Sequence, residues 1–321
     1  MLRFSRSGGA HPFTERAEPT LSLPMPTKNL PPRPNAEHPE RARLDLPYHE
    51  RITDPAFRRA VDLLDAGDAD RLRDHLRAHP EVIHQRVVFE GGNYFQSPSL
   101  LEFAAENPIR HGCLPDNIVE IAKVILDAGA KTDRSALDAT LGLVASGRVA
   151  RKSGAQIPLI DLLCDHGADP NQGLLTALAH AEFEAVDALL RRGAAMDLTA
   201  AAATGRLAEA RGALPAASLE ERHRALALAA QHGHAEIVRL LLEAGEDPDR
   251  YNPVGCHSHS TPLHQAAFNG HEEVVRLLVE RGARLGLRDL LYRGTPADWA
   301  DHAGRPEIAR YLRESQGDAL G

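Results

Sequence analysis

Aromatic side chains, cysteines and long apolar runs are all scarce in this chain of 321 residues. Phe, Tyr and Trp make up 4% of the sequence, so small aliphatic side chains, chiefly Ala and Leu, must fill the core. The three cysteines, Cys113, Cys164 and Cys256, are odd in number and far apart, which argues against secretion and predicts a cytoplasmic location. No apolar run approaches the ~20 residues of a membrane span, so we expect no membrane partner.

Net charge also narrows the classes of partner. The chain has a formal net charge of -8 and a pI near 6.1. Phosphate binding requires a concentrated positive surface, so nucleic acid is not expected as the main partner. Charged residues at 26% and apolar residues at 43% are typical of an ordinary folded domain.

Signatures of catalytic sites are missing from the sequence. Residues 147–153 resemble a phosphate-binding loop, but Arg151 stands where that loop requires glycine, so we interpret them as a basic surface insertion. Neither a G-x-S-x-G elbow nor a G-x-G-x-x-G turn occurs. We therefore expect no enzymatic activity and no cofactor.

The chain does contain a recurring helix pair, which is clearest at residues 261–283. Thr261 is a favourable N-cap and Pro262 suits the first helical position, so a helix is predicted to begin there. Gly270 ends this helix, and a second helix follows with apolar residues spaced i, i+3, i+4. Gly282 then closes the second helix in a left-handed conformation.

Weaker copies of this unit can be aligned on the closing glycine. Gly129, Gly167, Gly193 and Gly245 precede Gly282 at intervals of 38, 26, 52 and 37 residues. The interval of 52 is twice 26, which predicts a further short unit at residues 198–214. That unit is rich in Ala and Gly and offers little apolar area, so we expect it to be the weakest part of the array.

The order Thr-Pro-Leu-His-x-Ala-Ala, then Gly-His, then a Val/Leu-rich helix ending in Gly-Ala resembles the ankyrin repeat. The resemblance implies an all-α ankyrin-repeat solenoid of about eight helix pairs, with short β-hairpin fingers and irregular repeat lengths. We expect one continuous apolar core along the stack. Two β-rich runs around Gly91-Gly92 predict a hairpin finger at residues 87–95.

The predicted domains are a repeat region and two ends of different composition. Residues 1–48 are rich in Pro, Arg, Ser and Glu and are expected to form a disordered leader, within which Met25 is an alternative start. The ankyrin repeat domain is expected over residues 52–316, and residues 317–321 form a tail.

The resemblance implies a non-enzymatic interaction module that presents a concave surface to an unidentified protein partner, with the chain acting as a monomer. Tyr and Arg are favoured anchors of such surfaces because they combine large area with directional polar groups. We expect the contacts to come from three fingers. The candidate residues are Glu90, Asn93 and Tyr94 in the first finger; Arg250, Tyr251, Asn252, His257 and His259 in the second; and Arg288, Leu291, Tyr292 and Arg293 in the third.

Two alternatives come from other functional classes. Cys256, His257 and His259 share one loop, and thiolate and imidazole groups are zinc ligands, so a metal-binding or hydrolytic protein is one alternative. These three residues are too few for a closed site with four ligands, and no metal is expected. The second alternative is an exported effector that binds host proteins, since the Ala, Arg and Leu usage suggests a bacterium.

Overall fold

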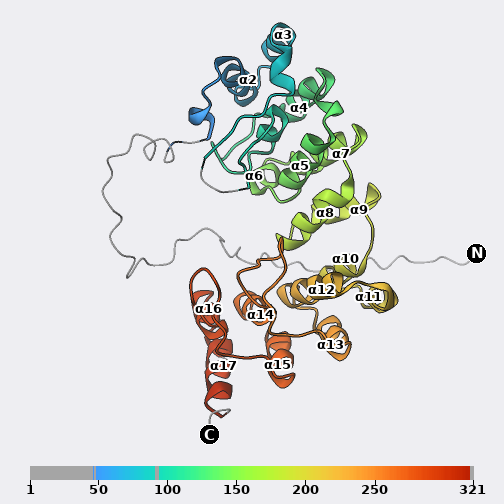
Figure 1. Cartoon of the computed structure of the whole chain (residues 1–321), viewed down its shortest axis with the longest axis vertical. Helices are drawn as coiled ribbons and strands as arrows, with labels where there is room; N and C mark the ends of the chain where they lie inside the picture. Colours follow the sequence, from blue (N-terminus) through green and yellow to red (C-terminus); the bar gives the residue numbers. More distant parts are fainter. Residues whose placement is uncertain (1–45, 47, 91–93, 319–321) are drawn as a thin grey trace, which may run out of the picture. The chain divides into compact units, whose positions relative to one another are not determined.

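The computed structural model describes residues 46, 48–90 and 94–318, and these are arranged as a series of helices (Figure 1). Within this part of the chain the only β-pairing is one isolated antiparallel bridge. Residues 1–45 and 47 of the predicted leader, which include the alternative start at Met25, and the last residues of the predicted tail lie outside the described residues. In the same described part, no helix has the length and apolarity needed to cross a bilayer.

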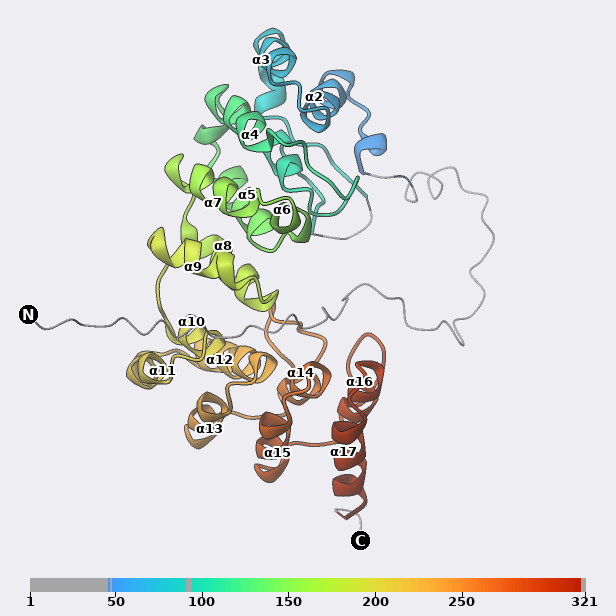
Figure 2. The ribbon, with the colours of Figure 1, turned by 180° about the vertical axis from the view of Figure 1, so that it is seen from behind.

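Helices pair in succession along the chain, and each pair packs on the next (Figures 1 and 2). Eight such pairs lie within the described residues, and the first member of the second pair is a 3-10 helix. The first helices are α2 (Pro55–Asp65), η3 (Leu100–Ala105), α5 (Arg134–Ala145), α8 (Pro170–Ala179), α10 (Leu198–Ala203), α12 (Leu219–His232), α14 (Pro262–Asn269) and α16 (Pro296–His302).

The second helices run on the other side of the stack. They are α3 (Ala69–Ala78), α4 (Ile118–Asp127), α7 (Gln156–Asp165), α9 (Phe183–Arg191), α11 (Leu207–Ala213), α13 (Ala235–Glu243), α15 (Glu272–Glu280) and α17 (Pro306–Asp318). The remaining helices are the short 3-10 turns η1 (Tyr48–Arg51), η2 (Pro80–Ile83), η4 (Ala130–Thr132) and η5 (Leu214–Ala216), and α6 (Arg148–Lys152). The short unit predicted at residues 198–214 is therefore present as α10 and α11.

Local sequence explains where these helices begin and end. Thr261 precedes α14 with Pro262 at the first helical position, and Gly270 ends the helix in the left-handed conformation, with φ of 81°. His264 fixes the start, because its Nδ1 atom lies 2.8 Å from Thr261 Oγ1 and its Nε2 atom lies 3.2 Å from the carbonyl oxygen of Gly294. This histidine thereby joins its own unit to the next one.

The basic segment at 147–153 is a helix and not only a surface insertion. Val149 and Ala150 of α6 are buried, whereas Arg148 and Lys152 are exposed. The apolar residues at the second and third positions anchor this extra turn between α5 and α7, which the basic composition of the segment had concealed.

The buried apolar residues form two clusters instead of the single core predicted, and the clusters meet at α10 and α12, which contribute residues to both. One cluster covers the helix pairs up to residue 194 and takes in Cys256 and part of α10 and α12. The other begins at Leu198 and continues to Leu312. Met196 is partly buried and packs against both clusters. The division arises because α10 contributes mainly alanines, whose small side chains bridge less apolar surface than leucine.

Polar contacts join the two halves where apolar packing is sparse. The last carbonyl groups of a helix have no partner within the helix. Those of α8 receive side chains from α12, two pairs further on: Gln231 Nε2 donates to the Ala179 oxygen at 2.7 Å, and His232 Nε2 lies 2.8 Å from the Leu178 oxygen. This set of contacts, which we call the α8 cap, is completed by His257 Nε2 at 3.3 Å from the Ala179 oxygen.

Candidate partner-binding surface

The first predicted finger consists of two extended runs that pair in antiparallel fashion. The N–H groups of Val87 and Phe89 donate to the carbonyl oxygens of Pro98 and Gln96, at 3.1 and 2.7 Å. The sequence interpretation as a hairpin is therefore correct in its pairing. Asn93, which was predicted to contact a partner, lies outside the described residues.

Aromatic packing fixes the base of this finger. The ring centroids of Phe89 and Phe95 lie 4.9 and 5.3 Å from that of Tyr48, in edge-on geometry. The two predicted partner-contact residues of this finger that the structure describes are exposed to solvent. Glu90 is exposed, and Tyr94 is 68% exposed. The first finger thus keeps two of its candidate residues accessible on a rigid base.

The second predicted finger, the loop at 250–260, folds back onto α8 instead of projecting freely (Figures 1 and 2). Cys256 is fully buried within the first core cluster. His257 adopts a left-handed φ of 59°, and its ring forms part of the α8 cap. His257 therefore has a structural contact, and its predicted contact with a partner stays a prediction.

Two further candidate residues in this loop make hydrogen bonds that stabilise the loop. Asn252 is only 3% exposed, and its N–H donates to the carbonyl oxygen of Ser260 at 2.8 Å. It is therefore unavailable to a partner, contrary to the prediction. The half-buried Tyr251 donates its hydroxyl to the Arg288 oxygen at 2.7 Å, and so joins this loop to the next. Arg250 stays exposed.

The third finger, residues 287–294, is organised by the buried carboxylate of Asp289. The carboxylate oxygens accept hydrogen bonds from the N–H groups of Leu291, Tyr292 and Gly294 and from Trp299 Nε1, at 2.6 to 3.0 Å. Burial opposes the charge on Asp289, but these donors outweigh burial and hold the pKa below its usual value. These hydrogen bonds to Asp289 stabilise the conformation of the loop. This role of Asp289 was not predicted from the sequence.

Several apolar side chains of the loop at 287–294 are exposed to solvent. Leu290, Leu291 and Tyr292 are 53%, 63% and 57% exposed, and the neighbouring Arg288 and Arg293 are also exposed. Leu290 is not among the residues predicted from the sequence, although its place beside Leu291 was a usable signal. Apolar groups held rigidly in solvent are a common mark of an interaction site.

His259 connects the second loop to the third. Its backbone oxygen accepts the N–H of Leu290 at 2.8 Å, and its ring centroid lies 6.2 Å from that of Tyr292 and 5.6 Å from that of Trp299. Burial lowers the pKa of His259, so the ring is neutral at pH 7. The two loops thus form one surface, defined by Arg250, Tyr251, His259, Arg288, Leu290, Leu291, Tyr292 and Arg293, which we call the last-loop surface.

The geometry around Cys256 offers no support to a metal centre. Burial raises the pKa of the Cys256 thiol to about 11, so the thiolate needed for zinc binding is disfavoured. The ring of His257 faces the backbone of α8. Across the described residues, no group of three or more His, Cys, Asp and Glu side chains is placed to hold a metal ion.

Comparison with known protein families agrees with this architecture. A family model described as ankyrin repeats (3 copies) matches residues 150–289 and 226–319, which together are more than half of the chain. The chain belongs to the ankyrin-repeat family. Its helix pairs are therefore ankyrin repeats over at least residues 150–319, and the module is of a type that binds other proteins.

Curated relatives point to the same family. The chain is 34% identical over 122 residues to cyclin-dependent kinase 4 inhibitor B of Bos taurus, a match that covers 29% of this chain and 92% of that protein. It is 36% identical over 129 residues to cyclin-dependent kinase inhibitor 2A of Homo sapiens, which covers 39% of this chain and 80% of that protein. The ankyrin-repeat chain described here is thus considerably longer than the stretch it shares with either relative.

Proposed function

We propose that this ankyrin-repeat protein is a non-enzymatic interaction module that binds a partner protein through the last-loop surface. The observation that carries this proposal is the loop at 287–294, where the buried Asp289 fixes the backbone while Leu290, Leu291 and Tyr292 stay exposed. A pre-ordered loop loses little conformational entropy on binding, so its apolar area contributes more fully to affinity. Arg288 and Arg293 supply polar contacts at the rim.

Glu90, Asn93 and Tyr94 of the first finger form a second, separate contact region in this proposal. The repeat domain is taken to span residues 52–316, between the leader at 1–48 and the tail at 317–321, and to act as a cytoplasmic monomer. The two relatives are named as inhibitors of cyclin-dependent kinases. Protein kinases therefore belong among the partner classes to be tested, alongside other proteins.

The test compares affinity capture by the full chain with capture by a variant carrying Leu291→Ser and Tyr292→Ser. We expect the variant to lose at least ~90% of a captured partner, because exposed aromatic and aliphatic anchors dominate binding energy. Leu219→Ser is the matched control, since Leu219 is a 69% exposed leucine on α12 outside the loops. Equal capture by the double variant and the intact chain, at equal melting temperature, contradicts the proposal.

A further inference from the structure

The row of second helices is interrupted between α9 and α11. Along the same row α7 packs against α9, α11 against α13, and α13 against α15, but no comparable packing joins α9 to α11, or α15 to the last helix, α17. The cause lies in α11, which has seven residues and buries only Ala210. Its face toward α9 therefore lacks the apolar side chains that would close the stack.

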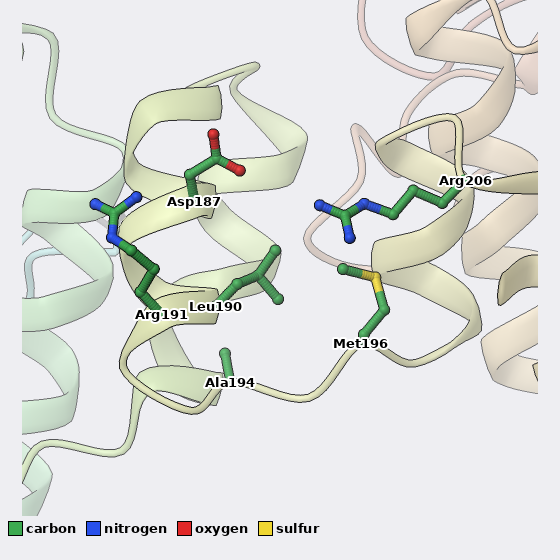
Figure 3. Close-up of a pocket in the computed structure, with 6 residues that line it drawn as sticks. All are labelled: Asp187, Leu190, Arg191, Ala194, Met196 and Arg206. Carbon is green, nitrogen blue, oxygen red and sulfur yellow. The ribbon is translucent and has the colours of Figure 1, made fainter. Parts of the chain in front are cut away.

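An open groove lies between α9 and the start of α11. Asp187, Leu190, Arg191 and Ala194 line one side, and Met196 and Arg206 line the other, around a volume of about 360 Å³ (Figure 3). Leu190 and Met196 are partly buried apolar side chains at its base. A second hollow lies on α11, which begins directly after Arg206, and is lined by Leu207, Ala208, Arg211 and Gly212.

The shape of this groove suits a helix or an extended segment. Asp187, Leu190 and Arg191 are spaced i, i+3 and i+4, so they form one stripe on α9, and Ala194 lies in the loop after the helix. On the α11 side, Ala208 and Gly212 are small and exposed, which lets another backbone approach closely. The groove thus resembles the space that a missing second helix would occupy.

The charge of the groove is positive and unbalanced. Arg191 and Arg206 line the groove, and Arg211 lines the hollow on α11. The structure gives none of the three an ion-pair partner within the described residues, and the acidic residue that lines the groove is Asp187. On neighbouring second helices, by contrast, arginines are paired with glutamates of their own helix. The pairs are Arg239 with Glu236 on α13, Arg276 with Glu272 on α15 and Arg310 with Glu307 on α17.

Arg206 shows why this position differs. It precedes α11 at the place that His234 holds before α13 and His271 before α15, where each histidine contacts the end of the previous first helix, at 3.0 and 2.8 Å. The α8 cap already serves the end of α8 with Gln231 and His232, so Arg206 is left to face the groove (Figure 3).

We propose that the groove between α9 and α11 binds an acidic amphipathic segment of a partner protein, with its apolar side on Leu190 and Met196 and its carboxylates on Arg191, Arg206 and Arg211. This surface lies on the second-helix side and is independent of the last-loop surface. Carboxylates fit arginine because the guanidinium offers several N–H donors in one plane.

The experiment uses the full chain and two synthetic helix-forming peptides of about five turns. Both peptides carry leucines along one face; the other face carries Glu in the first peptide and Lys in the second. Affinity is measured by fluorescence anisotropy. We expect the Glu peptide to bind at least ~10-fold more tightly than the Lys peptide, and this preference to shrink as salt rises, because screening weakens exposed ion pairs.

Two variants then locate the site. Substitution of Arg191, Arg206 and Arg211 by Gln should lower the affinity for the Glu peptide about 10-fold. Ala208→Trp should block peptide binding sterically without a change in charge. The matched control replaces Arg239, Arg276 and Arg310 by Gln, which removes the same charge from paired positions on the same row. The Leu291→Ser and Tyr292→Ser variant should bind the peptide normally.

Several outcomes overturn the proposal. These are no binding of the Glu peptide, equal binding of the Lys peptide, or an equal loss in the groove variant and the matched control. Concentration-dependent dimerisation that the groove substitutions abolish would assign the groove to a second copy of the chain. Preferential binding of a short DNA duplex to the same arginines would likewise replace the acidic protein segment as the occupant.

Discussion

Two junctions in the same stack are built very differently. Between α12/α13 and α14/α15, both rows of helices pack together, and Leu263, Ala266 and Leu278 are buried to 1% exposure or less. The ring of His271 lies across the junction, 2.8 Å from the Gln231 oxygen. Gly233 approaches that ring so closely that a Cβ atom would lie 2.5 Å from it.

Between α8/α9 and α10/α11, the first helices meet through alanines and the second helices leave the groove open. The α8 cap, made by Gln231, His232 and His257, supplies polar contacts there from more distant units. The comparison teaches that an ankyrin stack can remain connected where its apolar core is interrupted, provided that the carbonyl groups at a helix end find donors further along. The junction between α8/α9 and α10/α11, which we call the seam, therefore has fewer stabilising contacts and an open surface.

The largest expected difference between the junctions concerns a buried leucine. Leu278→Ala in the closed junction should lower the free energy of unfolding by about 3 kcal/mol, because it removes a fully buried side chain and leaves a cavity. Leu207→Ala at the open junction should lower it by less than about 1 kcal/mol, since Leu207 is only partly buried. Urea unfolding of both variants measures the difference. Equal losses would mean that the two junctions are equally packed.

Acidification should act on the α8 cap. Burial lowers the pKa of His232 from its ordinary 6.5 to about 4, with His234, His257 and His271 adding repulsion. The unfolded chain then takes up this proton near pH 6.5 and the folded chain only near pH 4, so the stabilising contribution is complete above 6.5 and is lost as pH falls toward 4. The loss is on the order of 3 kcal/mol.

The His232→Gln variant tests this attribution, because glutamine does not titrate. Its unfolding free energy should fall less steeply between pH 6.5 and pH 4 than that of the unmodified chain. His264, whose pKa is also lowered to about 4 by burial, remains in both proteins and so cancels in the comparison. Parallel pH profiles for the two proteins would show that His232 does not titrate with folding.

A smaller contrast is expected from two glycines with left-handed backbones. Gly233→Ala combines backbone strain at φ of 82° with the clash against His271, and should cost about 2 kcal/mol or more. Gly193→Ala has φ of 100° but no atom within 4 Å of the added Cβ, so strain alone, about 1 kcal/mol, should remain. Thermal denaturation compares them. A greater loss at Gly193 would contradict the description of the seam as open.

Local sequence was sufficient to predict the helix pairs. Thr261, Pro262 and Gly270 act over a few residues through capping and a left-handed turn, so their consequences are visible in the sequence. The interval of 52 residues between Gly193 and Gly245, twice the interval of 26 before it, likewise indicated the short unit α10/α11. These features depend on residues that are close in the chain, so they can be predicted from the sequence.

The position of the second loop could not be predicted in the same way. Cys256 is buried, and His257 reaches a helix end 78 residues away, so both contacts depend on how α8 and α12 stack. The same holds for Asp289, whose carboxylate is buried only once the loop closes around it. Exposure of the candidate residues is set by such distant contacts, and residue type alone does not determine it.

Native-state hydrogen exchange tests the central claim, that the seam at α10/α11 is held less firmly than the closed junction at α14/α15. Amide groups within residues 198–213 should exchange faster, and with a lower opening free energy, than those within 262–280, because α11 buries a single alanine whereas α15 buries four aliphatic residues. Equal protection of the two segments, or slower exchange at 198–213, would contradict the account.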